Sequence, residues 1–146
     1  MLYLLRHGDA EHETADDAAR RLTPKGEAQA RLAGAALAAL GAKLDACLTS
    51  PKVRAAETAR LACESLPGLE PEVAAELAAG AFDALALSSG RGDVLLVGHE
   101  PDFSEEIARL TGASAKLRKG GLAILEPSTL HALLRPKDLR LIAGSD

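Results

Sequence analysis

Short apolar runs alternate with longer stretches of mixed polarity along this chain, which predicts strands alternating with helices. Residues 2–5 and 94–97 consist almost wholly of large apolar side chains, and residues 44–48 carry apolar side chains at alternate positions. Short apolar runs of this kind are typical of strands buried on both faces of a parallel sheet. The pattern therefore predicts a buried sheet whose strands are connected by helices.

Two helices are predicted from their first residues. Thr23-Pro24 combines a capping residue with a proline at the first helical position, and Gly41 ends that helix. Ser50-Pro51 repeats this start, and the second helix runs to about Leu66. We interpret Ser50 first as the cap of this helix and only second as a residue of a functional site. The apolar stripe expected on the first helix consists of Ala28, Leu32, Ala35, Ala36, Ala39 and Leu40.

The remaining segments complete an α/β order. Residues 8–22 are polar and predict a loop over the sheet edge with at most one helical turn. The other predicted elements are an extended piece at 69–74, helices at 80–89 and 103–111, an antiparallel hairpin of strands 122–126 and 129–134, and a surface extension at 137–146. This order predicts one domain over residues 1–146, a three-layer α/β/α sandwich around a mostly parallel sheet.

Composition and charge exclude several classes of function. Of 146 residues, 47% are hydrophobic and 26% charged, as in globular domains, and no apolar run reaches the ~20 residues of a membrane helix. The net charge is −4, no basic stripe is visible and aromatic residues make up 2%, which argues against nucleic acid as a partner. Cys47 and Cys63 are expected to be reduced, buried side chains. We expect a cytoplasmic protein that does not bind membranes.

Three predicted strand exits carry residues with a shared chemistry. Arg6-His7-Gly8 follows the first strand, Thr49-Ser50-Pro51 the second, with Arg54 one turn into the helix, and Gly98-His99 follows the strand at 94–97. Ligands of parallel sheets bind beyond the carboxyl ends of the strands. If the three strands are neighbours, two arginines and two histidines converge there.

This combination suits phosphoryl transfer. Arginine binds phosphate through two parallel hydrogen bonds and stays charged. One histidine can attack phosphorus and carry the group covalently, while a second, protonated one can neutralise charge on the equatorial oxygens. A glycine such as Gly8 lets the backbone approach the phosphate.

The same residues resemble the signatures of a known family. The segment 4–10 (LLRHGDA) resembles the RHG motif of the histidine phosphatase (phosphoglycerate mutase-like) superfamily, 50–58 (SPKVRAAET) its second motif and 97–101 (VGHEP) its third. The short length, Asp9-Ala10 and the segment 119–123 (KGGLA) resemble the compact SixA-type phosphohistidine phosphatases. These motifs lie in order over almost the whole chain.

The resemblance implies a role for each matching residue. His7 would accept the phosphoryl group, and Arg6, Arg54 and His99 would bind it, with His99 counted as catalytic too. It implies no metal and no organic cofactor. The expected partner is a phosphohistidine-bearing protein or a small phosphate ester, the expected context signal transduction, and the expected state a monomer.

The chain departs from the wider family at the proton donor. Larger members place a glutamate in an extended loop, where this chain has the short segment 75–80 (AELAAG) with Ala79 at the position of the acid. Glu76 could substitute only if the segment turns it inward. Asp9, Glu100 and Asp102 are candidates to orient His7 or His99, or to supply the acid in the case of Asp9 and Glu100, whereas His12 and His131 are expected to be exposed.

Three functions remain open at this point. The chain could be a phosphatase of protein phosphohistidine, a broad phosphomonoesterase for small metabolites, or a phosphate-binding module without activity. Small metabolites call for an insertion that encloses them, and a protein substrate for an open rim. The chain has no room for a large cap, which favours the protein substrate.

Overall fold

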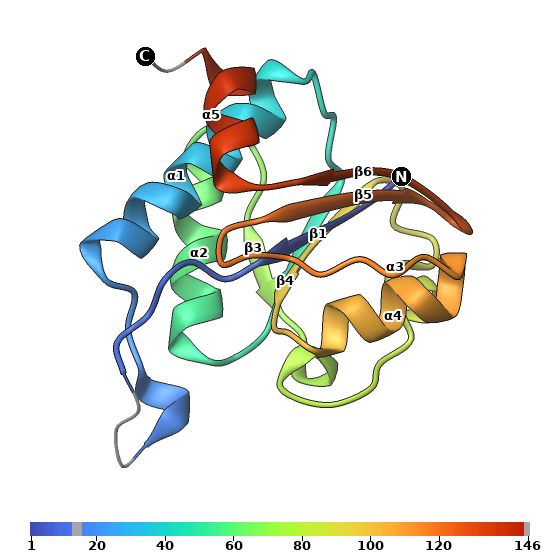
Figure 1. Cartoon of the computed structure of the whole chain (residues 1–146), viewed down its shortest axis with the longest axis horizontal. Coiled ribbons are helices and arrows are strands. Elements are labelled where there is room, and N and C mark those ends of the chain that lie inside the picture. The colour runs from blue at the N-terminus through green and yellow to red at the C-terminus, as the bar shows by residue number, and fades with distance from the viewer. Residues whose placement is uncertain (13–15, 145–146) are drawn as a thin grey trace.

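The computed structural model describes residues 1–12 and 16–144, which form a six-stranded sheet flanked by helices (Figure 1). The strands are ordered β3-β2-β4-β1-β5-β6 across the sheet. The elements in chain order are β1 (Leu2–Arg6), the 3-10 helix η1 (Asp17–Ala19), α1 (Pro24–Ala39), β2 (Ala46–Thr49), α2 (Val53–Cys63), β3 (Pro71–Val73), η2 (Ala75–Leu77), α3 (Ala84–Ser88), β4 (Val94–Gly98), α4 (Asp102–Thr111), β5 (Leu122–Glu126), β6 (Thr129–Leu134) and α5 (Pro136–Ala143).

The pairing of the strands confirms the mostly parallel sheet with a C-terminal hairpin. β1 and β2 both run parallel to β4, and β3 runs parallel to β2. β5 pairs antiparallel with β1 and with β6. The central strands β1 and β4 are almost entirely buried, as their continuous apolar runs require.

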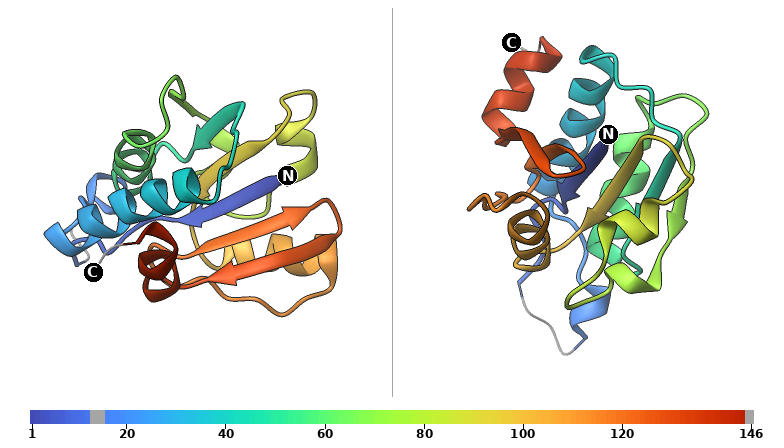
Figure 2. Two further views of the ribbon diagram at one scale, coloured as in Figure 1. Left: turned by 90° about the horizontal axis from the view of Figure 1, so that it is seen from above. Right: turned by 90° about the vertical axis from the view of Figure 1, so that its right-hand side faces the viewer.

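Helices cover both faces of the sheet, which confirms the three layers (Figure 2). On one face, side chains of α1, α2 and α5 pack against Tyr3, Leu5, Leu95 and Val97 of the central strands. On the other, α3 and α4 pack against the alternate residues of the same strands, with Phe103 of α4 fully buried. Each central strand therefore contributes to two cores.

The apolar stripe expected on α1 was wrong. Of its six members only Ala36 is buried, and Leu40 is 47% exposed. The buried face consists of Gly26, Ala30, Ala33, Gly34, Ala36 and Leu37. Small residues line it because α1 lies directly on α2: a Cβ on Gly34 would collide with the backbone of Ala62. Close helix packing selects small side chains, among them two glycines that the expected stripe did not include.

The C-terminal segment is not a surface extension, contrary to expectation. Residues 136–143 form α5, which packs on α1 and buries Leu139 completely. Asp138 accepts a hydrogen bond from the backbone N–H of Arg135, and this reciprocal cap fixes the start of the helix. The predicted helix 80–89 is also shorter and spans only Ala84–Ser88, whereas η1 supplies the single turn expected in the loop 8–22. In the part of the chain that the structure describes, no helix combines the length and apolarity needed to cross a membrane.

Candidate active site

The carboxyl ends of three neighbouring strands bring the predicted residues together. β4 lies between β1 and β2, with Arg6 opposite Gly98 and Thr49 opposite Val97. The backbone N–H of His7 donates to the carbonyl of Gly98 (3.0 Å), and that of Ser50 donates to the carbonyl of Val97 (3.0 Å). The sheet ladder thus continues one residue beyond each strand and fixes the residues of the exit loops.

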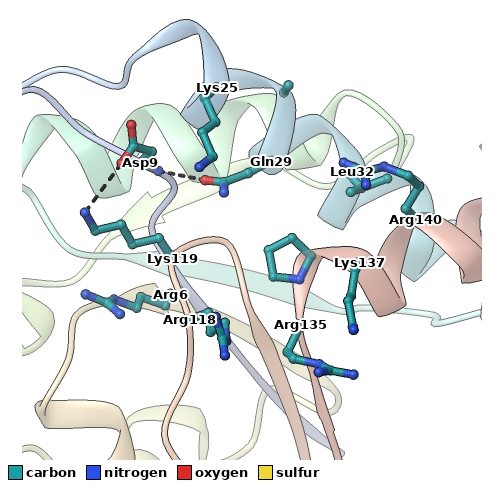
Figure 3. Close-up of a pocket in the computed structure, with 12 residues that line it drawn as sticks. Arg6, Asp9, Lys25, Gln29, Leu32, Arg118, Lys119, Arg135, Lys137 and Arg140 are labelled. Carbon is teal, nitrogen blue, oxygen red and sulfur yellow. Dashed lines mark hydrogen bonds and ion pairs between the residues drawn. The ribbon is translucent and has the colours of Figure 1, made fainter.

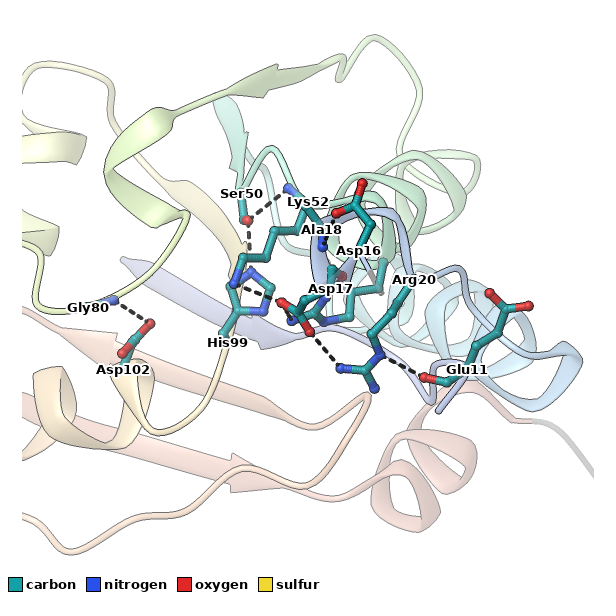
Figure 4. A network of polar contacts seen from close by, with 11 residues as sticks. Glu11, Asp16, Asp17, Ala18, Arg20, Ser50, Lys52, Gly80, His99 and Asp102 are labelled. Carbon is teal, nitrogen blue, oxygen red and sulfur yellow. Dashed lines mark hydrogen bonds and ion pairs between the residues drawn. The ribbon is translucent and has the colours of Figure 1, made fainter. Parts of the chain in front are cut away.

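A pocket of about 340 Å³ lies at this edge. His7 and His99 line it, and Figure 4 shows the polar contacts around His99. The other lining residues are Arg6, Arg20, Lys52, Arg54, Ala78, Ala79, Gly80, Glu100, Pro101, Asp102 and Lys119. The four residues singled out from the motifs therefore share one cavity, and Arg20, Lys52 and Lys119 add cations that sequence analysis missed.

The loop that carries His7 is clamped between two helices. The backbone N–H of Gly8 donates to Oγ1 of Thr58 (3.1 Å), and this hydroxyl in turn donates to the carbonyl of Arg54 (2.7 Å). On its other side, a Cβ on Gly8 would lie 2.5 Å from the carbonyl oxygen of Gly26 in α1. Gly8 is therefore required by the close approach of α1, and Thr58 joins the His7 loop to the helix of Arg54.

His7 is held as a neutral ring with one free nitrogen. Its Nδ1 lies 2.7 Å from the carbonyl oxygen of Gly8, which can only accept, so Nδ1 carries the proton and Nε2 keeps its lone pair. Burial, with the guanidinium groups of Arg54 and Arg6 acting in the same direction, lowers the pKa of His7 to about 4. A neutral imidazole with a free Nε2 is a nucleophile near neutral pH.

His99 is oriented by Ser50, not by a carboxylate. Its Nε2 lies 2.8 Å from Oγ of Ser50, and its ring centroid is 5.2 Å from that of His7. Burial lowers the pKa of His99 to about 3, with His7 and Arg54 acting in the same direction. His99 is thus neutral in the unliganded pocket, and the protonated form expected from its role would need a bound anion to stabilise it.

Ser50 is a site residue rather than the cap of α2, which corrects its assignment. The helix begins at Val53, and its N-cap Lys52 makes no side-chain capping bond. The hydroxyl of Ser50 accepts from the N–H of Lys52 (3.2 Å) and contacts His99. The serine-proline pair suggested a helix start, and no sequence signal pointed to a contact with a histidine 49 residues away.

Asp17 accepts hydrogen bonds from the guanidinium group of Arg54. Nη1 and Nη2 of Arg54 donate to the backbone carbonyl and carboxylate of Asp17, at 2.9 and 3.3 Å. The same carboxylate pairs with Arg20 (3.1 Å) and Lys52 (3.4 Å). These cations, Arg20 foremost, lower the pKa of Asp17 to about 2. Asp17 therefore stays ionised and ties η1 to the pocket.

Three buried nitrogen atoms around the pocket have no hydrogen-bond partner among the described residues. They are Nε of Arg6, Nε of Arg54 and Nδ1 of His99. The Arg6 guanidinium is otherwise fixed by its Nη1, which donates to the carbonyl of Leu117 (2.9 Å). Unsatisfied buried N–H groups are costly, and an oxyanion would satisfy those of the two arginines.

The predicted carboxylates serve structure instead of orienting the histidines. Glu100 accepts from the N–H groups of Ser104 (2.6 Å) and Leu117 (3.0 Å), and Asp9 accepts from Thr23 (2.7 Å). Asp102 accepts from the N–H of Gly80 (3.1 Å). Within residues 1–12 and 16–144, no carboxylate is hydrogen-bonded to His7 or His99.

Glu76 lies outside the pocket. It is exposed and lines a separate hollow beside Phe82, whereas Ala78, Ala79 and Gly80 form the pocket wall. No group of three His, Cys, Asp or Glu side chains in the described part of the chain is placed to hold a metal ion. His12 and His131 are exposed, as expected.

Comparison with known proteins decides the family. Residues 2–86, which carry the first two motifs, match the family model described as the histidine phosphatase superfamily (branch 1). The chain belongs to the histidine phosphatase superfamily. Its convergent Arg6, His7, Arg54 and His99 therefore sit in the pocket of a phosphatase fold.

Individual relatives extend this assignment. An uncharacterized protein of Picosynechococcus sp. is 35% identical over 134 residues, which cover 83% of this chain and 81% of that protein. The protein histidine phosphatase SixA, solved in complex with tungstate, superimposes with a TM-score of 0.80 at 26% identity, covering 94% of this chain and 98% of SixA. The α-ribazole phosphatase of Shigella flexneri matches with a TM-score of 0.72 at 20% identity, covering 92% and 96% of the two chains, which shows a shared fold. This histidine phosphatase is thus of the SixA type.

Proposed function

We propose that this histidine phosphatase removes the phosphoryl group from phosphohistidine in proteins, through a covalent intermediate on His7. The observation that carries the proposal is the pocket wall at Ala78–Gly80, which bears no acidic side chain while Glu76 points into another hollow. The two carboxylates that do line the pocket, Glu100 and Asp102, accept hydrogen bonds from backbone N–H groups. Such a site suits a substrate whose leaving group needs no dedicated proton donor. The open pocket and the likeness to SixA support the same substrate class.

The first chemical step is an attack by His7. The lone pair of its Nε2 forms a bond to phosphorus as the bond from phosphorus to the leaving group breaks and takes its electron pair with it. Arg6 and Arg54 bind the equatorial oxygens, where negative charge gathers. The negative charge of the bound phosphoryl group raises the proton affinity of the His99 imidazole. Once protonated, His99 is a further hydrogen-bond donor to the phosphoryl oxygens.

The second step regenerates the enzyme. A water molecule attacks the phosphorus of phospho-His7, the P–N bond breaks and its electron pair returns to Nε2. The proton lost by water leaves with the inorganic phosphate, so the ring is again neutral. The bond from Nδ1 to the Gly8 carbonyl keeps the same tautomer through both steps.

Leaving-group chemistry explains the substrate preference. An alkyl phosphate expels an alkoxide, which needs a positioned acid. A phosphohistidine that is protonated on its ring expels a neutral imidazole, whose conjugate acid has a pKa of about 6.5. A nitrophenyl phosphate lies between the two, because nitrophenolate is a tolerable leaving group.

A phosphomonoesterase for small metabolites is the second candidate, favoured by the fold shared with an α-ribazole phosphatase. The experiment that separates the two compares kcat/KM at one pH for a phosphohistidine peptide, p-nitrophenyl phosphate and glycerol phosphate. We expect this order of decreasing efficiency, with glycerol phosphate slowest by at least about 10²-fold.

The control variant for this experiment is Glu76→Gln. Because Glu76 is exposed and outside the pocket, we expect its kcat/KM on each substrate to stay within about two-fold of wild type. Equal efficiency on glycerol phosphate and phosphohistidine would refute the proposal. A protein that binds phosphate but turns over none of the three substrates would instead be a binding module.

A further inference from the structure

A second cavity, shown in Figure 3, is larger than the pocket of His7. It measures about 720 Å³ and lies between α1, the loop before β5 and the start of α5. Arg6 and Lys119 line both cavities, so the second one adjoins the pocket of His7. We call this cavity the basic groove; Lys25, Arg118, Arg135, Lys137 and Arg140 complete its charged walls together with Asp9.

The basic groove is positively charged, whereas the whole chain carries a net negative charge. Seven of the 17 lysines and arginines line it, with one carboxylate, although the chain carries a net charge of −4. Asp9 pairs with Lys119 (3.4 Å), and Arg135 pairs with Asp138. Within residues 1–12 and 16–144, the other five cations have no ion-pair partner: Arg6, Lys25, Arg118, Lys137 and Arg140. The expectation of no basic stripe was therefore wrong.

The kind of side chain indicates the kind of ligand. Arg118, Lys137 and Arg140 are exposed, and they extend long flexible chains from two separate elements. Such a surface offers dispersed point charges, unlike the buried and fixed donors that hold a single phosphate. No aromatic side chain lines the groove, so it offers no platform for stacking a nucleobase.

We propose that the basic groove binds an acidic segment of the phosphoprotein substrate, next to the phosphorylated histidine. This rests on the proposed function, because the phosphohistidine in the His7 pocket sets where the segment lies. Carboxylates along an extended or helical segment match charges spread over the groove. Complementary charge mainly accelerates encounter and selects the partner, so the groove acts on kcat/KM and not on the chemical step.

The experiment uses two phosphohistidine peptides of equal length. One carries Asp and Glu on both sides of the phosphohistidine, and the other carries Asn and Gln at the same positions. We expect the wild-type enzyme to prefer the acidic peptide by about 10-fold or more in kcat/KM at low ionic strength. The preference should shrink as salt is added, because salt screens exposed charges.

A double variant tests whether the groove causes this preference. Lys25→Glu and Lys137→Glu change the first turns of α1 and α5, where an acidic residue is compatible with the helix. We expect the preference for the acidic peptide to disappear in this variant, while kcat on p-nitrophenyl phosphate stays within about two-fold. The matched control is Lys43→Glu with Arg60→Glu, two exposed cations outside both cavities, which should keep the preference.

Three results would overturn the proposal. They are equal kcat/KM for the two peptides in wild type, an undiminished preference in the groove variant, or an RNA oligomer of equal charge that inhibits at lower concentration than the acidic peptide. A failure of the proposed function is seen separately, as hydrolysis of neither peptide. Fluorescence anisotropy with the unphosphorylated acidic peptide then tests the groove alone: binding lost in the groove variant supports it, and no binding in wild type refutes it.

Discussion

The catalytic pocket and the basic groove both gather positive charge, but they hold it in different ways. In the pocket, Arg54 is 6% exposed and its guanidinium is fixed by two hydrogen bonds to Asp17. In the groove, Lys137 and Arg140 are exposed and have no ion-pair partner among the described residues. The pocket therefore presents a few donors at set positions, whereas the groove presents many movable charges.

This difference separates chemistry from recognition. A transition state has one geometry, so donors that are already in place stabilise it without further reorganisation. A partner segment has many conformations, and long exposed side chains adapt to them. The two cavities share Arg6 and Lys119, so fixed donors and movable charges lie next to each other on one surface of the enzyme.

The largest expected effect comes from His7. The variant His7→Asn keeps an amide near the Gly8 carbonyl but removes the nucleophile, and we expect kcat to fall by at least about 10³-fold on every substrate. In wild type, acid-labile phosphate should accumulate on His7 after a rapid quench, detected by intact mass. Circular dichroism of the variant serves as the folding control. Turnover retained by His7→Asn would remove His7 from the mechanism.

Exchanging arginine for lysine distinguishes the two cavities directly. Arg54→Lys keeps the charge but loses the paired donors, and we expect kcat/KM to fall by about 10²-fold. Arg140→Lys in the groove should change kcat/KM for the acidic phosphohistidine peptide by less than about two-fold, because a point charge suffices there. The comparison would fail if both substitutions had the same effect.

Acid should destabilise the pocket and leave the groove unaffected. The folded pKa of His7 is about 4 and that of His99 about 3, below the ordinary value of 6.5, so protons bind the unfolded chain better. Stability is therefore lost as the pH falls below about 6.5, by about 2 kcal/mol for each histidine at pH 5. The groove cations stay charged throughout this range.

Urea unfolding at pH 7 and pH 5 measures this loss. We expect His7→Asn to lose about 2 kcal/mol less than wild type between the two pH values, since one of the two buried rings is gone. The carboxylates are common to both proteins, so their contribution cancels in the difference. Identical losses in the two proteins would show that His7 is not held neutral by the fold.

The amino-acid pattern reveals the pocket but not the groove, for a physical reason. Arg6, His7 and His99 directly follow strands that their apolar runs identify, and parallel strands place their exits on one edge. The groove exists only because α5 docks on α1, through the fully buried Leu139 and the partly buried Ile142 and Ala143. These three residues follow helical spacing, but they span little more than one turn, which is too short a pattern to show where the helix packs.

The side-chain contacts within the site could not be predicted from the sequence either. Ser50 reaches His99 and Asp17 reaches Arg54 through hydrogen bonds between segments 49 and 37 residues apart. The local sequence indicates neither hydrogen bond, because Ser50 also suits a helix start and Asp17 also suits a solvated loop. The motifs thus predicted which strand ends meet, while the partners of each side chain depend on tertiary geometry.

The carboxylate of Asp17 has a consequence for how phosphate enters and leaves. It bridges Arg54, Lys52 and Arg20, so a phosphoryl group that takes the Nη2 donor of Arg54 exchanges one anion for another, while the excess positive charge of the cluster still attracts it. The affinity of the pocket for phosphate therefore depends on the difference between the two anions and not on the charge of Arg54 alone.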